Sequence, residues 1–154
     1  MFHIVLLEPE IPPNTGNIIR LCANSGSKLH LIHPLGFKLD DKRLRRAGLD
    51  YHEWADVGEY NSLDDFLSQV APKHLYGCTT KGKRSYADVS FTPGDALLFG
   101  PESRGLPAQL LAELDPEQRI RIPMKPESRS LNLSNAVALM LYEAWRQCDF
   151  AGGE

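Results

Sequence analysis

Short apolar runs alternate along the chain with segments whose apolar residues recur at helical spacing. Apolar runs bounded by turn-forming residues are typical of buried strands, and a helical period is typical of amphipathic helices. We expect strands at Phe2–Leu7, Lys28–His33, Glu53–Val57, Lys73–Thr79, Asp95–Gly100 and Arg119–Pro123. We expect helices from a cap at Asn14 to Ser25, over Asp40–Ala47 and Ser62–Val70, in a short stretch ending near Leu114, and from Leu133 to Gln147. This alternation predicts one α/β domain over residues 1–154, with a mostly parallel sheet flanked by helices.

The last of these helices carries two apolar stripes. The first stripe consists of Leu133, Ala136, Val137, Met140, Leu141 and Ala144. The second consists of Ala138, Leu139, Tyr142 and Trp145. One stripe is enough to pack a helix on its own core, so the second predicts burial on another side, plausibly against a second subunit. Ser130 and Asn132 are both suitable N-caps, because a short oxygen-bearing side chain accepts a hydrogen bond from the first helical N–H groups.

Three loops with unusual chemistry leave the ends of predicted strands. They cover Glu8–Asn17, Gly100–Gly105 and Ile122–Asn132. In parallel α/β sheets, ligands bind beyond the carboxyl ends of the strands, where such loops meet. The three loops are therefore candidates for one ligand site. The third loop fits equally well a plain polar connection into a C-terminal core helix.

Composition narrows the class of protein. The chain is 42% hydrophobic and 24% charged, with a net charge of −3, which argues against a protein that coats nucleic acid by bulk charge. No apolar run approaches the roughly 20 residues of a membrane helix, and the first residues lack the basic region of a signal peptide. The scattered Cys22, Cys78 and Cys148 fit a reducing compartment. We therefore expect a cytoplasmic protein. We also expect no metal site, because the five histidines lack ligand spacing.

Basic residues are concentrated in a few segments despite the acidic total. The clusters are Lys38, Lys42, Arg43, Arg45 and Arg46, then Lys81, Lys83 and Arg84, then Arg119, Arg121, Lys125 and Arg129. Such segregation permits a local anionic partner such as RNA. It is also common on an ordinary solvated surface, so both interpretations stay open.

Several common catalytic signatures are missing. The chain has no G-x-G-x-x-G after a strand and no G-x-x-x-x-G-K-[ST], which removes the main support for dinucleotide and P-loop sites. It has no G-x-S-x-G either, which argues against a serine hydrolase. Cys78, at a strand end, is compatible with a nucleophile, but a buried inert thiol explains it more simply.

The first two loops contain polar residues that invite a functional interpretation. Asn17, Arg20 and Asn24 share one face of the first predicted helix. They form either a solvated face or a functional stripe. Gly100 would let backbone approach a ligand closely, and Glu102 offers a carboxylate. Glu102 is either part of a site or simply a loop acid near the start of a helix.

The three loops resemble, in order, the three motifs of the SpoU branch of the SPOUT RNA methyltransferases. The matching segments are Asn14-Thr-Gly-Asn-Ile-Ile-Arg20, Leu98-Phe-Gly-Pro-Glu-Ser-Arg-Gly-Leu-Pro107, and Ile122-Pro-Met followed by Ser130-Leu-Asn-Leu-Ser-Asn and Tyr142-Glu143. Segments 8–13, 41–51 and 143–147 resemble the small bacterial members that methylate the wobble-position ribose of tRNA. The resemblance spans residues 1–148, nearly the whole chain.

The resemblance implies a fold, an assembly and a cofactor. The implied fold has a C-terminal trefoil knot, an exception to the rule that chains are not knotted. The implied assembly is a homodimer, which agrees with the second apolar stripe of the last helix. The implied cofactor is S-adenosylmethionine, bound by Cys78, Thr79, Gly100, Glu102, Ile122, Met124, Ser130 and Leu131. Cys78 departs from the family pattern, because relatives tend to carry a larger apolar residue there.

The implied reaction moves a methyl group from a sulfonium to a ribose 2′-oxygen, with Arg20, Glu102, Ser130 and Asn132 as catalytic residues. Neutralising an arginine at pH 7 costs roughly 9 kcal/mol, because its ordinary pKa lies far above neutrality. We therefore hypothesise that Arg20, contributed across the dimer, stabilises the developing alkoxide and is not the base. Glu102 would position Arg20, and a phosphate or water would take the proton. Ser130 and Asn132 would hold the ribose or the cofactor.

The implied substrate is the anticodon stem-loop of tRNA, with cytidine or uridine at the wobble position. Candidate RNA contacts are Asn14, Asn17, Lys42, Arg43, Arg46, Lys81 and Arg129, because cationic and amide side chains bind phosphates. We expect no DNA or membrane partner. Two alternatives stay open, namely methylation of another tRNA or rRNA site and a non-catalytic RNA-binding module. Transfer of a labelled methyl group to RNA would exclude the non-catalytic RNA-binding module, and the labelled nucleotide would distinguish the two possible methyltransferases.

Overall fold

Seven short strands within the described part of the chain form a single sheet. The computed structural model describes residues 1–54 and 56–154, with only the backbone described at Asp41 and Tyr51. The strands are β1 (His3–Leu7), β2 (Lys28–Ile32), β3 (Gly58–Tyr60), β4 (Leu75–Cys78), β5 (Arg84–Ser85), β6 (Ala96–Phe99) and β7 (Arg119–Arg121). Their order is β3-β2-β1-β6-β4-β7-β5. Every strand pairing among the described residues is parallel, which confirms the expected mostly parallel α/β sheet.

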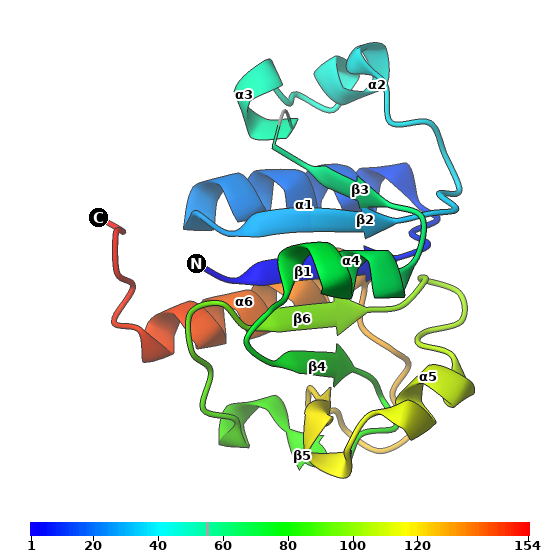
Figure 1. The fold of residues 1–154 in the computed structure, drawn as a ribbon, viewed down its shortest axis with the longest axis vertical. Coiled ribbons are helices and arrows are strands. Elements are labelled where there is room, and N and C mark those ends of the chain that lie inside the picture. The colour runs from blue at the N-terminus through cyan, green and yellow to red at the C-terminus, as the bar shows by residue number, and fades with distance from the viewer. Residues whose placement is uncertain (55) are drawn as a thin grey trace.

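The residues that the structure describes also form six α-helices and two 3₁₀ turns, most of them between strands. The helices are α1 (Pro12–Ser25), α2 (Asp41–Arg46), α3 (Tyr51–Trp54), α4 (Leu63–Val70), α5 (Ala108–Glu113) and α6 (Leu133–Gln147). The 3₁₀ turns cover Tyr86–Asp88 and Pro116–Gln118. Figure 1 shows α4 and α5 in front of the sheet, with α1 and α6 behind it. None of the helices that the structure describes is long and apolar enough to cross a membrane.

The interior strand β1 is buried on both faces, as expected for an apolar strand inside a parallel sheet. Ile4 and Leu6 point into a core cluster that also contains side chains of α1 and α6. Val5 and Leu7 point the opposite way, into a second cluster that contains Phe66 of α4. Alternate residues of one strand therefore fasten helices to both sides of the sheet.

The start of α1 lies before the expected cap. The helix begins at Pro12, and its N-cap residue Ile11 provides no side-chain hydrogen bond. Two prolines at the first helical positions explain the early start, because proline has no N–H to lose there and its backbone φ already suits a helix. Asn14 therefore lies inside the first turn.

The prediction of a strand at Glu53–Val57 is wrong for every residue of that segment that the structure describes. Tyr51–Trp54 forms α3, and the strand begins only at Gly58; Ala55 lies outside the described residues. Asp50 explains the helix, because its Oδ1 accepts a hydrogen bond from the Glu53 N–H at 3.3 Å while Glu53 Oε1 accepts from the Asp50 N–H at 3.3 Å. Such reciprocal bonds stabilise a helix start.

Helix α6 has one core face and one surface face. Val137, Met140, Leu141 and Ala144 of the first stripe are buried, as predicted. In the second stripe, Leu139 is 43% exposed and Tyr142 is 39% exposed. Asn132 caps the helix, since its Oδ1 accepts a hydrogen bond from the Ser134 N–H at 2.9 Å. Of the two predicted caps, Asn132 is therefore the one used.

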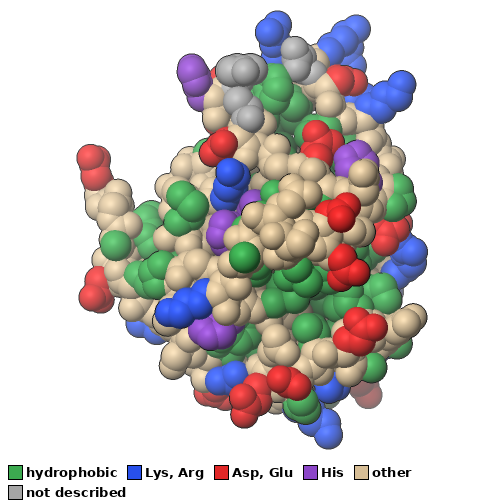
Figure 2. Space-filling view, in the orientation of Figure 1, with side chains coloured by type: hydrophobic (Ala, Val, Ile, Leu, Met, Phe, Trp, Pro, Cys, Tyr) green, Lys and Arg blue, Asp and Glu red, His purple; other side chains and the backbone are tan. Residues whose placement is uncertain are grey.

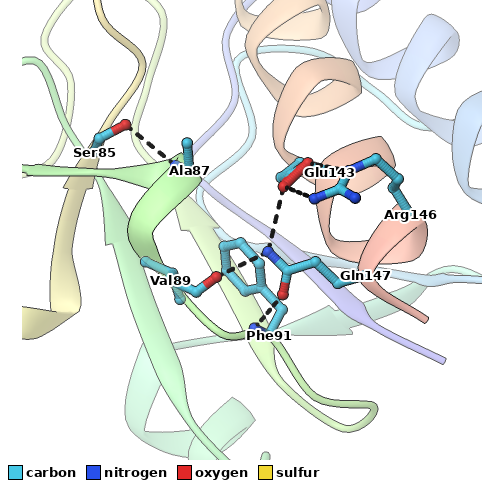
Figure 3. Close-up of polar contacts among 7 residues, drawn as sticks. All are labelled: Ser85, Ala87, Val89, Phe91, Glu143, Arg146 and Gln147. Carbon is cyan, nitrogen blue, oxygen red and sulfur yellow. Dashed lines mark hydrogen bonds and ion pairs between the residues drawn. The ribbon is translucent and has the colours of Figure 1, made fainter. Parts of the chain in front are cut away.

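The far end of α6 is fastened to the segment that precedes β6. Gln147 Oε1 accepts a hydrogen bond from the Phe91 N–H at 2.8 Å, and Gln147 Nε2 donates to the Val89 carbonyl at 2.8 Å. Figure 3 shows this amide between the two backbone groups, with the Glu143–Arg146 ion pair one turn away. One side chain thus satisfies a backbone donor and a backbone acceptor, as a neighbouring strand would.

Candidate functional site

A cavity of about 480 Å³ lies at the carboxyl ends of β4, β6 and β7, against the first turns of α6. Residues of all three predicted loops line it, so the loops do meet at one edge of the sheet. Its lining includes Ile11, Asn14, Cys78, Thr79, Thr80, Lys81, Gly100, Glu102, Ser103, Ile122, Met124, Ser130, Leu131, Asn132, Ala136 and Met140. The lining combines apolar side chains with a few polar groups, namely hydroxyls, amides and a carboxylate. This combination is typical of a small-molecule site.

The first two loops are joined by two carboxylates that cap each other's backbone. Glu102 accepts hydrogen bonds from the Glu10 N–H at 2.8 Å and the Ile11 N–H at 2.7 Å. Glu10 accepts from the Ser103 N–H at 2.8 Å and from the Ser103 hydroxyl at 2.7 Å. The bonds from Ser103 lower the pKa of Glu10, which keeps it ionised. Glu102 also supplies the carboxylate that α1, without a side-chain cap of its own, lacks at its positive end.

The third loop joins the other two through a pair of amides. Asn14 Nδ2 donates to Glu102 Oε2 at 3.3 Å, and Asn14 Oδ1 accepts from Asn132 Nδ2 at 3.1 Å. Asn132 Oδ1 in turn accepts the hydroxyl of Ser134 at 2.6 Å. A continuous hydrogen-bonded chain therefore runs from loop 100–105 through the first turn of α1 to the cap of α6, and it fixes the cavity wall.

Gly100 is required for the shape of its own loop. A Cβ at this position would lie 2.2 Å from the Gly105 carbonyl carbon and 2.3 Å from the Leu106 nitrogen. Any side chain there would therefore push the loop apart. The close approach seen here is to the returning half of the same loop. Gly100 also lines the cavity, and the expected approach of its backbone to a ligand stays a prediction.

Cys78 and Thr79 form the cavity wall at the end of β4. The Thr79 N–H donates to the Ile120 carbonyl at 2.9 Å, and the Thr79 hydroxyl accepts from the Lys81 N–H at 3.1 Å. Burial raises the pKa of the Cys78 thiol well above its ordinary value. A thiol of raised pKa is a poor nucleophile at neutral pH, so Cys78 acts as an apolar wall residue. The three cysteines are free thiols.

The predicted cofactor-binding residues all line this cavity. Cys78, Thr79, Gly100, Glu102, Ile122, Met124, Ser130 and Leu131 belong to its wall, as does Asn132. Arg20 does not line it, and its guanidinium instead bonds Glu53, with Nε to Oε2 at 2.9 Å, and the Gly48 carbonyl. The expectation that Glu102 positions Arg20 is therefore not met within one chain, because the carboxylate of Glu102 bonds the backbone of the first loop.

The predicted RNA contacts divide into surface residues and one interior residue. Asn17, Lys42, Arg43, Arg46, Lys81 and Arg129 are exposed. Figure 2 shows Lys and Arg side chains gathered at the end of the molecule where Figure 1 places α2. Asn14 differs, because it is 6% exposed and both ends of its amide hold the loops together. Its role in the structure is to shape the cavity, and an RNA contact is not needed to explain it.

Four residues important to this arrangement were not anticipated. Glu10 and Ser103 clamp the first two loops, and their sequence context offers no signal for a contact between segments so far apart. Glu53 and Gly48 hold Arg20. The Asp50–Glu53 spacing of a capping box was a usable signal for α3. No group of three His, Cys, Asp or Glu residues suited to a metal ion occurs among the residues described.

Comparison with known proteins places this arrangement in context. A model of the SpoU rRNA Methylase family matches residues 1–142. A tRNA (cytidine(34)-2′-O)-methyltransferase of Aeromonas hydrophila is 62% identical over 152 residues, which cover 99% of this chain and 97% of that protein. A solved structure concerned with 2′-OH methylation of C/U34 on tRNA is 45% identical, with a TM-score of 0.87 and 97% of each chain covered.

A more distant neighbour has a bound cofactor. The SpoU methyltransferase AviRb of Streptomyces viridochromogenes, solved in complex with AdoMet, is 26% identical with a TM-score of 0.81. The match covers 99% of this chain and 58% of that one. Since the family model matches nearly the full length and the relatives agree over the same span, the chain belongs to the SpoU rRNA Methylase family.

Proposed function

We propose that this protein transfers a methyl group from S-adenosylmethionine to the ribose 2′-hydroxyl of the wobble nucleotide, cytidine or uridine, in the anticodon loop of tRNA. The observation that carries the proposal is the cavity in which all three family motifs meet, joined by the Glu102–Asn14–Asn132 chain of hydrogen bonds. Full-length relatives named for methylation of cytidine 34 support the choice of substrate.

The residues of the cavity fit S-adenosylmethionine. Its volume of about 480 Å³ lies in the range of roughly 300–1,000 Å³ that is usual for small-molecule sites. Ile122, Met124 and Leu131 would hold the adenine and Thr79 and Ser130 the polar groups, while the Glu102 carboxylate suits a cationic donor. When bound, the cofactor supplies a methyl group activated by a sulfonium. No metal is required for such a transfer.

Arg20 would act on the ribose by charge. Pairing with Glu53 raises the pKa of Arg20 further above its ordinary value, so a neutral guanidine able to accept a proton becomes still rarer. A fixed cation stabilises the alkoxide that develops as the 2′-hydroxyl loses its proton. A phosphate or water would accept that proton, while Ser130 and Asn132 keep the ribose or cofactor in place.

We extend the proposal to a homodimer in which Arg20 serves the cavity of the partner subunit. Arg20 is absent from the lining of its own cavity, which supports a contribution across an interface. Helices α1 and α6 pack together on one face of the sheet. The exposed Leu139 and Tyr142 of α6 therefore lie on the same side of the molecule as α1 and offer an apolar patch for a second copy.

The remaining parts of the proposal concern the fold and the RNA surface. We include the C-terminal trefoil knot of the SPOUT fold, supported by the match to SpoU structures. The tRNA would lie along the basic α2 region and the Lys81 and Arg129 loops, because phosphate contacts position an RNA without reading its sequence. A protein acting on tRNA in this way is expected in the cytoplasm.

Incubation with methyl-labelled S-adenosylmethionine and total tRNA, followed by nuclease mapping, tests the proposal. We expect label on the 2′-oxygen of nucleotide 34. Label at another tRNA or rRNA nucleotide would indicate a different target, and RNA binding without any label would indicate a non-catalytic module. Either result contradicts the proposed function.

A further inference from the structure

The guanidinium of Arg20 is held along one edge only. Its Nε donates to Glu53 Oε2 at 2.9 Å, and its Nη2 donates to Glu53 Oε1 at 3.3 Å and to the Gly48 carbonyl. Its Nη1 has no partner among the residues that the structure describes. A two-point contact with a carboxylate fixes the plane of a guanidinium as well as its position, so the unpaired Nη1 edge has a defined direction.

Glu53 is itself held in place from two sides. Its Oε1 accepts from the Asp50 N–H at 3.3 Å, while its own N–H donates to Asp50 Oδ1 at 3.3 Å. These bonds open the four-residue helix α3. The side chain of Glu53 is 19% exposed, against 47% for Arg20, and the bonds from Arg20 lower the pKa of Glu53. The acid is thus the more buried and more constrained partner.

Gly48 and Leu49 connect this pair to the core. Gly48 has a φ of +79°, in the left-handed region, and Leu49 beside it is buried at 4% exposure in the core cluster of α1 and α6. The left-handed turn ends α2 and directs the Gly48 carbonyl to Arg20. The acceptors of Arg20 therefore belong to a short α2–α3 segment that is anchored under the helix carrying Arg20.

We propose that Glu53 is the positioning residue for Arg20 in the methyl transfer described above, so that this inference rests on the proposed function. Glu53 holds the Nε–Nη2 edge of the guanidinium, together with the Gly48 carbonyl, and leaves the Nη1 edge for the ribose oxygen. A surface ion pair of this kind contributes little to the free energy of folding. Its geometry therefore matters more for orienting Arg20 than for stability.

The test compares Glu53→Gln with Glu59→Gln in the full-length protein. Glu59 is a matched control, because it is an exposed acid paired with His33 at 2.9 Å in the neighbouring strand β3. Single-turnover methylation of tRNA should slow about 10- to 100-fold in Glu53→Gln, the scale expected when a reacting group is misplaced by about 1 Å. The KM for S-adenosylmethionine and the Tm should stay unchanged, and Glu53→Asp should recover part of the rate.

A double-mutant cycle separates positioning from a general structural effect. If Glu53 acts through Arg20, adding Glu53→Gln to Arg20→Ala should slow the reaction no further. The inference is overturned if Glu53→Gln keeps the wild-type rate, or if its slower rate comes with a lower Tm. It is also overturned if the rate reductions of Glu53→Gln and Arg20→Ala multiply in the double variant. If the wild-type protein methylates no tRNA, the proposed function fails first. A wild-type protein that methylates nucleotide 34 while Glu53→Gln is equally fast leaves that function intact.

Discussion

Replacing Glu102 by alanine should destabilise the fold and the cavity together. The carboxylate accepts the Glu10 N–H at 2.8 Å, the Ile11 N–H at 2.7 Å and the Asn14 amide at 3.3 Å. Hydrogen bonds to a charged acceptor contribute about 1.5–3 kcal/mol each, less where water can replace them, so we expect a total loss of about 2–4 kcal/mol. For a chain of this size that corresponds to a Tm lower by about 4–16 °C.

Thermal unfolding followed by circular dichroism measures this effect, with Glu113→Gln as the control. Glu113 is an exposed acid of α5, so its variant should melt like the wild type. The Tm of Glu102→Gln should also fall. One of the two carboxylate oxygens becomes an amide nitrogen, which cannot accept a hydrogen bond from the backbone N–H that it faces. Binding of S-adenosylmethionine, measured by calorimetry, should weaken in both Glu102 variants. An unchanged Tm in Glu102→Ala would refute the capping role that we assign to Glu102.

Three further outcomes follow from other contacts. Asn132→Ala removes the cap of α6 and the bond to Asn14, so the Tm should fall by the equivalent of about 0.5–2 kcal/mol; unchanged cofactor affinity in this variant would contradict the role of the amide chain. Gln147→Ala leaves the backbone of residues 89–91 without two bonds and should cost about 1–3 kcal/mol in urea unfolding. Equal urea midpoints for Gln147→Ala and the wild type would contradict that stabilising role. Burial lowers the pKa of His30 to about 3, so the folded state favours neutral imidazole. His30 should therefore reduce stability as pH falls from 6.5 towards 3, and His30→Gln should flatten that slope. A slope as steep as in the wild type would refute it.

Local patterns predicted the elements well where one element decides its own structure. The unbroken apolar run through Ile4, Val5 and Leu6 predicts a buried strand, and β1 is an interior strand of the sheet buried on both faces. The first stripe of α6 is buried in the core, as predicted, while burial of the second stripe against another subunit stays a prediction. The expectation that three loops meet at one edge follows from parallel strands alone.

Predictions failed where contacts between distant segments decide. Glu102 bonds Glu10 and Ile11, which lie some ninety positions earlier, and sequence spacing carries no information about that pairing. The partner of Arg20 depends on how the α2–α3 segment folds back onto α1. The mistaken strand at Glu53–Val57 hid this contact, because apolar residues there suggested a strand although Asp50 and Glu53 have the spacing of a helix start.

The site residues show the same division. Their membership of one cavity came from the family resemblance, and the structure places all of the predicted cofactor contacts in its wall. The structural role of each site residue depends on its hydrogen bonds. These bonds make Asn14 and Glu102 the groups that hold the loops, and they leave Arg20 outside the cavity of its own chain.

The most direct test of the central claim uses two tRNA substrates that differ by one atom. One carries a ribose at nucleotide 34 and the other a 2′-deoxyribose at the same position. The account predicts that labelled methyl transfers to the first tRNA, appears as a 2′-O-methyl nucleotide at position 34, and is absent from the second. Equal labelling of both tRNAs, or label on the base, would contradict it.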